Sequence, residues 1–358
     1  MAGGEPQLEL VREYPGPNEH DYIDKLAALV KSKVAEMYPP GKTLRDVHAK
    51  QHGTVRAEFV VEELPEDLRV GVFRKPRIFP ALVRFSNGNQ SGARPDIKRD
   101  TRGLAIKLLG VAGDKILDDE KHAQTQDFLT ATSNVLNVKD PAELYEFSFA
   151  FYGSPIAMLG FFFNPFKPHL RSLKNLGPMM QKHASLLGAR YWSITPYLFG
   201  DRAAKYSINP APGVSAIVPK NPRDCYLREG LAEHLARQDA TMDFMIQFQT
   251  DPKRMPIENA AVAWDERVSP FRKIATIRIP RQEFDNARQM DFGDNLSFTP
   301  WHSLPEHRPL GGINRCRKVL YYEISKLRHD RNQTPRNEPA SIDDFLSLAS
   351  ARVYEASS

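Results

Sequence analysis

Three residues near the C-terminal end of the chain combine a phenol with two guanidinium groups. Arg317, Tyr321 and Arg328 follow one another at spacings that keep them near one face of a helix. A phenol binds a metal ion poorly while it is protonated, and a neighbouring cation favours the phenolate. Tyr321 is therefore a candidate metal ligand, with Arg317 one turn earlier as the cation. The alternative is a helix on which these side chains merely pack and form ion pairs.

Two histidines near the N-terminal end are candidates for acid–base chemistry. They lie in the run Arg45-Asp-Val-His48-Ala-Lys-Gln-His52-Gly53. An imidazole can take up a proton and return it near neutral pH. A pair of histidines at this spacing can also bind a metal ion on a helix. Gly53 and the strand-like residues after it argue against a helix here, and no HExxH glutamate is present.

These two motifs and a third resemble segments of the haem catalases. The R-x-x-x-Y pattern that ends at Tyr321 is similar to the catalase proximal helix, whose tyrosine binds the haem iron. The run around His48 is similar to the distal R-x-x-H-A-K-x-x-G segment. Val83-Arg84-Phe85-Ser86 and the run from Arg99 to Lys107 resemble the V-R-F-S and R-D-x-R-G-x-A-x-K strands of the catalase barrel.

The resemblance implies haem b as the cofactor and a role for each matching residue. Tyr321 would be the iron ligand; its rival Tyr322 lies about 100° further round the helix and has no arginine four residues earlier. His48 would be the distal acid/base, with His52 as the next candidate. Ser86 would accept the Nδ1 proton of His48 and so fix its tautomer.

The same resemblance implies how the haem carboxylates are held. Arg45, Arg84 and Arg328 would neutralise the two propionates. Arg317 and Val47 complete the expected cofactor-binding set, since Arg317 supports the phenolate and Val47 precedes the distal histidine. Catalases have an apolar residue before this histidine, whereas their allene oxide synthase relatives have a threonine.

The distal asparagine of the catalases has no clean counterpart in this chain. An ungapped match that ends at Asp140 places Ala131 at that position. Asn134 or Thr132 could replace it after a small shift, and we include Asn134 among the expected catalytic residues. Because the amide helps to position peroxide, its loss would weaken dismutation of hydrogen peroxide more than haem binding.

The chain is shorter than full-length catalases and looks more like the small catalase-related haem proteins. These include peroxidases and the allene oxide synthases and hydroperoxide lyases that act on fatty-acid hydroperoxides. The segments 125–128 and 191–206 resemble parts of these proteins. We therefore expect a haem enzyme that decomposes or rearranges peroxides, with an organic hydroperoxide favoured over hydrogen peroxide. The alternative is a non-catalytic haem-binding or storage protein with the same fold.

An aromatic segment from Phe149 to Phe166 is broken by Gly and Pro. Such a run is typical of a core or of a dimer contact, and we expect a homodimer. It could instead line a channel for a lipid hydroperoxide or form a peripheral contact with a membrane surface.

Hydrophobic periodicity predicts an α+β protein. The resemblance implies, more specifically, a catalase-like antiparallel β-barrel with surrounding and inserted helices and a haem buried beside the barrel. The expected strands are 53–63, 81–85, 104–109, 127–129, 214–218, 243–249 and 273–279. The expected helices are 21–37, several within 141–187, 310–332 and 342–353. The expected division is an N-terminal arm and helix over 1–40, the haem-binding barrel domain over 41–332, and a linker with a short helix over 333–358.

Composition excludes several other classes of protein. The net charge of +5 is small and the basic residues are scattered along the chain, which argues against a nucleic-acid partner. Cys225 and Cys316 have no CxxC companion, so neither a disulfide framework nor a structural zinc site is indicated. No apolar run reaches the length of a signal peptide core or a membrane span, and we expect a cytoplasmic protein.

Overall fold

A nine-stranded antiparallel sheet forms the centre of the computed structural model, which describes residues 8–214 and 217–350. The strands are β1 (Gln51–Val61), β2 (Arg77–Asn87), β3 (Arg102–Leu109), β4 (Thr125–Ala131), β5 (Tyr191–Trp192), β6 (Tyr197–Phe199), β7 (Arg202–Asn209), β8 (Ala240–Phe248) and β9 (Arg272–Ile279). Their order is β5-β4-β3-β2-β1-β9-β8-β7-β6. Because β5 also pairs with β7, the sheet closes into a barrel, and β6 lies outside the closed ring.

The inside of the barrel is filled by apolar side chains. Alternate residues of each strand point inward, as Val83 and Phe85 of β2 do. Aromatic rings occupy the centre, where the Phe244 ring centroid lies 5.1 Å from that of Phe59 and 5.0 Å from that of Phe128. A packed interior leaves a ligand site only at the outer wall or the ends of the barrel. The polar residues Arg84 and Ser86, which alternate with the inward ones on β2, belong to that outer wall.

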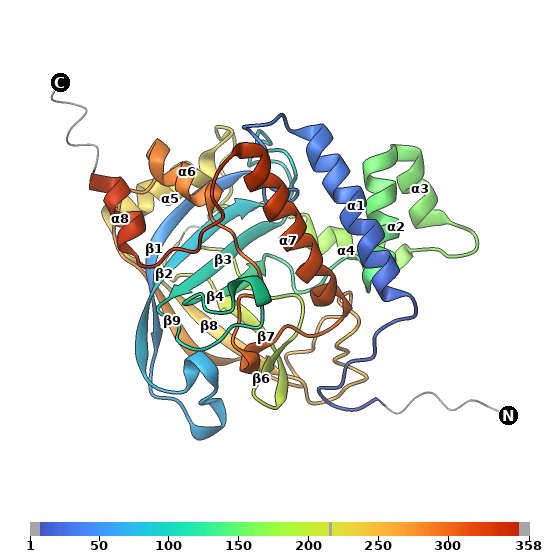
Figure 1. Cartoon of the computed structure of the whole chain (residues 1–358), viewed down its shortest axis with the longest axis horizontal. Coiled ribbons are helices and arrows are strands. Elements are labelled where there is room, and N and C mark those ends of the chain that lie inside the picture. The colour runs from blue at the N-terminus through green and yellow to red at the C-terminus, as the bar shows by residue number, and fades with distance from the viewer. Residues whose placement is uncertain (1–7, 215–216, 351–358) are drawn as a thin grey trace.

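The described helices lie around the barrel in two groups on different sides of it (Figure 1). They are α1 (Glu19–Met37), α2 (Pro141–Gly153), α3 (Pro155–Phe163), α4 (Leu170–Met179), α5 (Tyr226–Arg237), α6 (Ala287–Asn295), α7 (Gly312–Asn332) and α8 (Asp343–Ser350). One apolar face of α1, which includes Leu26 and Val34, packs against Cys316 and Ile324 of α7. α7 therefore lies between the barrel and α1, and α2 and α3 lie further out (Figure 1).

The start of α7 is fixed by a glycine and a group of carboxylates. Gly311 has a φ of 87°, and a Cβ there would lie 2.4 Å from the carbonyl oxygen of Ile257, so a larger residue does not fit. Arg315 in the first turn lies 2.6 Å from Glu19 and 2.8 Å from Glu258. These contacts tie the helix to two distant segments and set its position along the barrel.

Most of the expected elements are confirmed, and two expectations need correction. The strand expected at 214–218 is wrong at its described residues 214, 217 and 218; the strand of this region is β7, which ends before Pro210 and Pro212, residues that cannot donate to a ladder. The stretch expected to be helical over 141–187 divides into α2, α3 and α4, with breaks before Pro155 and Pro165, because proline disfavours helical backbone in the preceding residue, and its last part, 180–187, is not helical.

The C-terminal helix expected over 342–353 is present as α8, and its last three residues lie outside the described residues. Among the described helices, none has the length and apolar character that a membrane span requires.

Candidate active site

His48 and Ser86 meet on the outer wall of the barrel. His48 precedes β1 and has a φ of 61°, a left-handed conformation that non-glycine residues seldom adopt. The Nδ1 atom of His48 lies 3.0 Å from Ser86 Oγ. With the Nδ1 proton donated to this hydroxyl, the lone pair of a neutral imidazole is on Nε2. The predicted pairing of these two residues is therefore present in the structure.

Gly103 provides the space in which the His48 ring lies. It pairs with Ser86 across β2 and β3. A Cβ at Gly103 would lie 2.5 Å from His48 Nδ1 and 2.8 Å from Ser86 Oγ, much closer than van der Waals contact allows. Gly103 lies within the catalase-like run from Arg99 to Lys107, but its sequence position alone indicates no role. Only the register between the two strands reveals that this glycine lies under the imidazole.

The surroundings of His48 keep its ring neutral. Burial, together with the positive charges of Arg84, Arg317 and Arg45, lowers the pKa of His48 to about 3. The ring is thus neutral throughout the physiological range, with an unprotonated nitrogen. Arg84 donates to the carbonyl oxygen of His48, and Arg45 and Arg328 of α7 both donate to the carbonyl oxygen of Leu296, so the N-terminal motif and α7 contribute to one site.

Arg45, Arg84 and Arg328 converge beside the end of α6. Arg45 and Arg84 each have a guanidinium nitrogen 3.6 Å from Asp294 Oδ1. Arg328 donates to the carbonyl oxygens of Asp294 and Leu296. Burial lowers the pKa of Arg84 to about 9, and the nearby charge of Arg45 acts in the same direction. Three residues from distant parts of the chain thus form one cluster.

This cluster carries more positive charge than its own carboxylate balances. Three guanidinium groups surround Asp294, whose Oδ1 has no hydrogen-bond partner among the described residues. The buried Nε of Arg84 also has none within the described part of the chain. Buried charge requires compensation. An excess of two positive charges and an unpaired donor fit a ligand with two carboxylates, which is what haem b would present.

The proximal candidates also meet as predicted. Arg317 donates from Nη2 to the hydroxyl oxygen of Tyr321 over 3.0 Å, and its guanidinium carbon lies 5.0 Å from the centre of that ring. Nη1 of Arg317 faces three further side chains. They are Thr195 at 3.2 Å, Asn314 at 3.1 Å and Tyr197 at 3.4 Å. A guanidinium held in this way favours the charged form of a phenol.

These supporting residues were not singled out in the sequence. Thr195 and Tyr197 belong to the segment 191–206, which the resemblance covered without assigning roles. Burial lowers the pKa of Arg317, but the Tyr321 and Tyr197 phenols outweigh burial and leave its pKa raised. Arg317 therefore keeps its charge.

Tyr322 and His52, the two rivals, lie in different surroundings. A hydrogen bond with Asp119 raises the pKa of Tyr322, which disfavours a phenolate there. The buried His52 ring has Nε2 2.7 Å from Asn87 Oδ1 and Nδ1 3.7 Å from Asp96. Both rivals thus have partners outside the His48–Ser86 pair and the arginine cluster.

The segment after β4 supplies no amide bonded to His48. Ala131 pairs with Gly103 in the sheet, so this segment starts next to the distal pair. Asn134 is exposed, and Thr132 Oγ1 accepts a hydrogen bond from the backbone of Arg102. Asn137 is buried instead, and its Nδ2 has no partner among the described residues. Val47 is 46% exposed beside the distal histidine.

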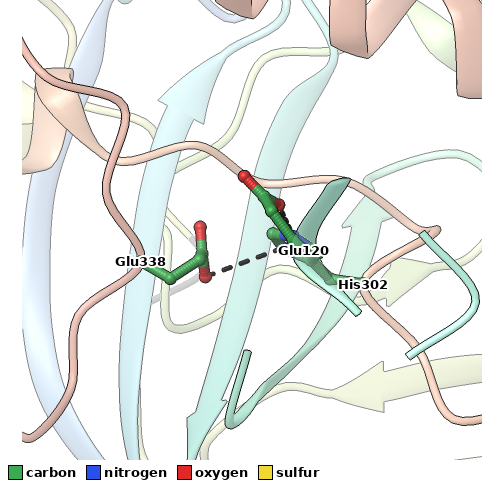
Figure 2. A group of neighbouring side chains, drawn as sticks. All are labelled: Glu120, His302 and Glu338. Carbon is green, nitrogen blue, oxygen red and sulfur yellow. Dashed lines mark ion pairs between the residues drawn. The ribbon is translucent and has the colours of Figure 1, made fainter. Parts of the chain in front are cut away.

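A second group of titratable side chains lies on another part of the barrel wall. Glu120, His302 and Glu338 bring one potential ligand atom each within 4.8 Å of one another (Figure 2). His302 contacts Glu120 through Nε2, and its Nδ1 lies 3.3 Å from Asp127. Carboxylates and an imidazole in this arrangement are typical of a divalent metal site.

Cations of the chain already balance most of this charge. Lys107 Nζ lies 2.7 Å from Asp127 and 2.5 Å from Glu338, and Arg336 lies 3.0 Å from Glu120. Burial lowers the pKa of Lys107, but its two carboxylate partners outweigh burial and raise it, so the ammonium stays charged. We therefore interpret the group as an ion-pair network that fastens the segment after α7 to β3 and β4.

The architecture is that of the catalase-like α+β class: a closed antiparallel barrel, with helices around it and inserted between its strands. A fungal catalase superposes with a TM-score of 0.64 and 17% identity, over 93% of this chain and 68% of that chain. Catalase A from Saccharomyces cerevisiae superposes with a TM-score of 0.66 and 17% identity, over 94% of this chain and 71% of that chain. No family model and no curated protein sequence matches the chain. The predicted fold is confirmed.

Proposed function

We propose that the chain binds haem b and acts on peroxides. The observation that carries the proposal is the conjunction of three features in one site. Arg317 is bonded to Tyr321, His48 is bonded to Ser86, and a buried cluster of three arginines has an excess of positive charge. Tyr321 would bind the iron, and Arg45, Arg84 and Arg328 would hold the two carboxylates. The catalase-like fold supports this reading.

The protein residues would manage the proton during peroxide cleavage. Bound haem iron supplies the electrons for breaking the O–O bond. His48, neutral and with a free Nε2, would take the proton from the hydroperoxide and return it to the departing oxygen. Ser86 would hold the imidazole in the tautomer that this requires. Arg317 would maintain the phenolate of Tyr321.

Within this class we propose an organic hydroperoxide, such as that of a fatty acid, as the preferred substrate. Asn134 is exposed, and neither it nor the buried Asn137 donates to His48, so the amide that positions hydrogen peroxide in catalases has no evident equivalent. The apolar Val47 is contrary evidence, because it leaves the distal histidine as catalases have it. The alternative is haem storage, which needs the ligand and the arginines but not the His48–Ser86 pair.

The test compares His48→Ala with the unaltered chain at equal haem content. We expect a high-spin tyrosinate spectrum in both proteins and a fall in peroxide turnover of about a hundredfold or more in the variant. Hydrogen peroxide and a polyunsaturated fatty-acid hydroperoxide are assayed side by side. Absence of haem binding would refute the proposal. Haem binding with no turnover in the unaltered chain would favour storage. A preference for hydrogen peroxide above about tenfold, roughly 1.4 kcal/mol, would contradict the proposed substrate.

A further inference from the structure

Two short helices, α3 and α4, form a hairpin with an unusual surface. We call α3, the segment 164–169 and α4 the apolar hairpin; α3 lies at the outer edge of the molecule beyond α1 and α2, and α4 returns toward the barrel (Figure 1). α3 contains no charged residue. A helix that is apolar on all sides is normally buried in a protein core or in a membrane. α3 is only half buried, so its outer side needs an explanation.

The two sides of α3 have different surroundings. Phe161 and Phe162 on the inner side pack against Ala150 of α2 and Leu176 of α4. Ile156, Leu159 and Phe163 recur at helical spacing on the outer side and are exposed, Ile156 by 80%. Phe166 in the following segment is 96% exposed. The outer surface of the hairpin is thus a continuous apolar patch rather than scattered single residues.

The apolar patch continues onto α4 and into a groove. Leu170 and Leu173 are exposed on α4, and Lys174 follows Leu170 by one turn on the same side. A groove of about 480 Å³ runs between α2 and α3, with Phe149 and Gly160 among its lining residues. Its lining combines aromatic rings with the polar side chains of Glu146, Asn164 and Lys167.

The residues around the apolar patch carry positive charge, which favours an anionic partner. Residues 147–200 contain no Asp or Glu. Lys167 pairs with Glu146 of α2, whereas Lys174 and Lys182 are exposed and have no ion pair among the described residues. Apolar side chains bordered by free lysines are the features by which short interfacial helices bind membranes with anionic lipids.

A second copy of the chain fits this surface less well. A twofold-symmetric contact would press the patch against itself. The carboxylates next to the patch, Glu143 and Glu146, are already paired with Arg171 and Lys167, so a second copy would bring little negative charge to Lys174 and Lys182. A lipid surface instead offers hydrocarbon to the aromatic rings and phosphate or carboxylate groups to the lysines.

We propose that the apolar hairpin docks the protein on an anionic membrane surface, with Phe163 and Phe166 entering the acyl region and Lys174 and Lys182 contacting headgroups. The docking does not depend on the haem chemistry. It would place the enzyme where hydroperoxides of membrane fatty acids are formed, and in this respect it extends the proposed function.

Sedimentation with lipid vesicles tests the docking. We expect the full chain to sediment with vesicles of phosphatidylcholine and phosphatidylserine in equal parts, more strongly than with phosphatidylcholine alone, and less strongly as salt is added. Combining Phe163→Ser with Phe166→Ser should lower the partition coefficient by about a hundredfold. Lys174→Glu with Lys182→Glu should reduce it about fivefold or more per lysine on the anionic vesicles alone.

The control is Ile78→Ser, which removes an apolar side chain from β2 that is about as exposed as Phe163 and should leave vesicle binding unchanged. Equal binding of the double serine variant and the unaltered chain would overturn the proposal. Absence of vesicle binding by the unaltered chain would also overturn it. If light scattering then shows a dimer that dissociates in the double serine variant, the patch is a contact between copies. Haem content is recorded throughout, so that failure of docking and failure of haem binding are seen separately.

Discussion

At the scale of single residues, two adjacent tyrosines on α7 differ in which charge lies beside the phenol. Tyr321 receives a hydrogen bond from the charged Arg317, and Tyr322 lies beside the acidic Asp119. A cation favours a phenolate and an anion disfavours it. The charge of the neighbouring side chain, more than the position on the helix, therefore makes Tyr321 the better candidate for the iron ligand than Tyr322.

Replacement of each tyrosine by phenylalanine tests this distinction. Tyr321→Phe should remove the tyrosinate bands from the absorbance spectrum of the haem-loaded protein and reduce its haem content. Tyr322→Phe should preserve both, because its partners Asp119 and Arg336 lie outside the haem-binding set. A Tyr321 variant with an unchanged spectrum would show that another residue binds the iron.

At the scale of elements, the distal histidine depends on a strand that it does not belong to. The β2–β3 register brings Gly103 opposite Ser86, and the absence of a side chain at Gly103 leaves room for the imidazole. The backbone of His48 is held by its own hydrogen bond to the carbonyl oxygen of Gly88. The ring therefore cannot move away freely if the space is filled.

Gly103→Ala is expected to displace the His48 ring while the haem stays bound. Misplacement of a catalytic group by about 1 Å costs on the order of a hundredfold in rate. We therefore expect peroxide turnover to fall by about that factor with little change in the haem spectrum. Gly230→Ala is the control, because Gly230 lies in α5 with no atom within 4 Å of the added methyl group. Equal turnover in the two variants would mean that Gly103 has no positioning role.

The sequence predicts individual strands and motifs better than it predicts how they combine. Alternation along β2 predicts that Arg84 and Ser86 share a face, and the motif predicts the partner of His48. It does not predict that Asp294 would lie among the three arginines, since this contact joins segments some two hundred residues apart. Nor does it predict the side-chain directions after β4, because this segment is irregular and follows no period; Asn134 is exposed there, and its role stays a prediction.

At the scale of the whole molecule, the segment after α7 is fastened to the barrel by the carboxylate of Glu338 and by the ion pair between Arg336 and Glu120. Glu338 accepts from Thr125 at 2.8 Å and pairs with Lys107, which has no exposed surface. Loss of one partner of a buried ion pair leaves the other charge poorly compensated. Asp127 still balances Lys107, so the effect should remain moderate.

Glu338→Gln is expected to lower the free energy of unfolding by about 2 kcal/mol and to expose the segment 333–350 to proteases. Chemical denaturation and limited proteolysis measure the two effects. Glu233→Gln makes the same chemical change in an exposed pair with Arg237 and should cost well under about 1 kcal/mol. If both variants have equal stability, the network does not hold this segment.

The position of β6 outside the closed ring bears on how the chain avoids aggregation. An open strand edge is a template on which another chain can pair. The segment before α7 covers this edge, because the backbone amides of Leu198 and Gly200 donate to the carbonyl oxygens of Arg308 and Glu306. Leu310, the residue before Gly311, donates its backbone amide to the carbonyl oxygen of Pro196. The same few residues that prevent edge-to-edge pairing thus also anchor the start of α7, so selection for solubility and selection for the position of Tyr321 act on one short piece of chain.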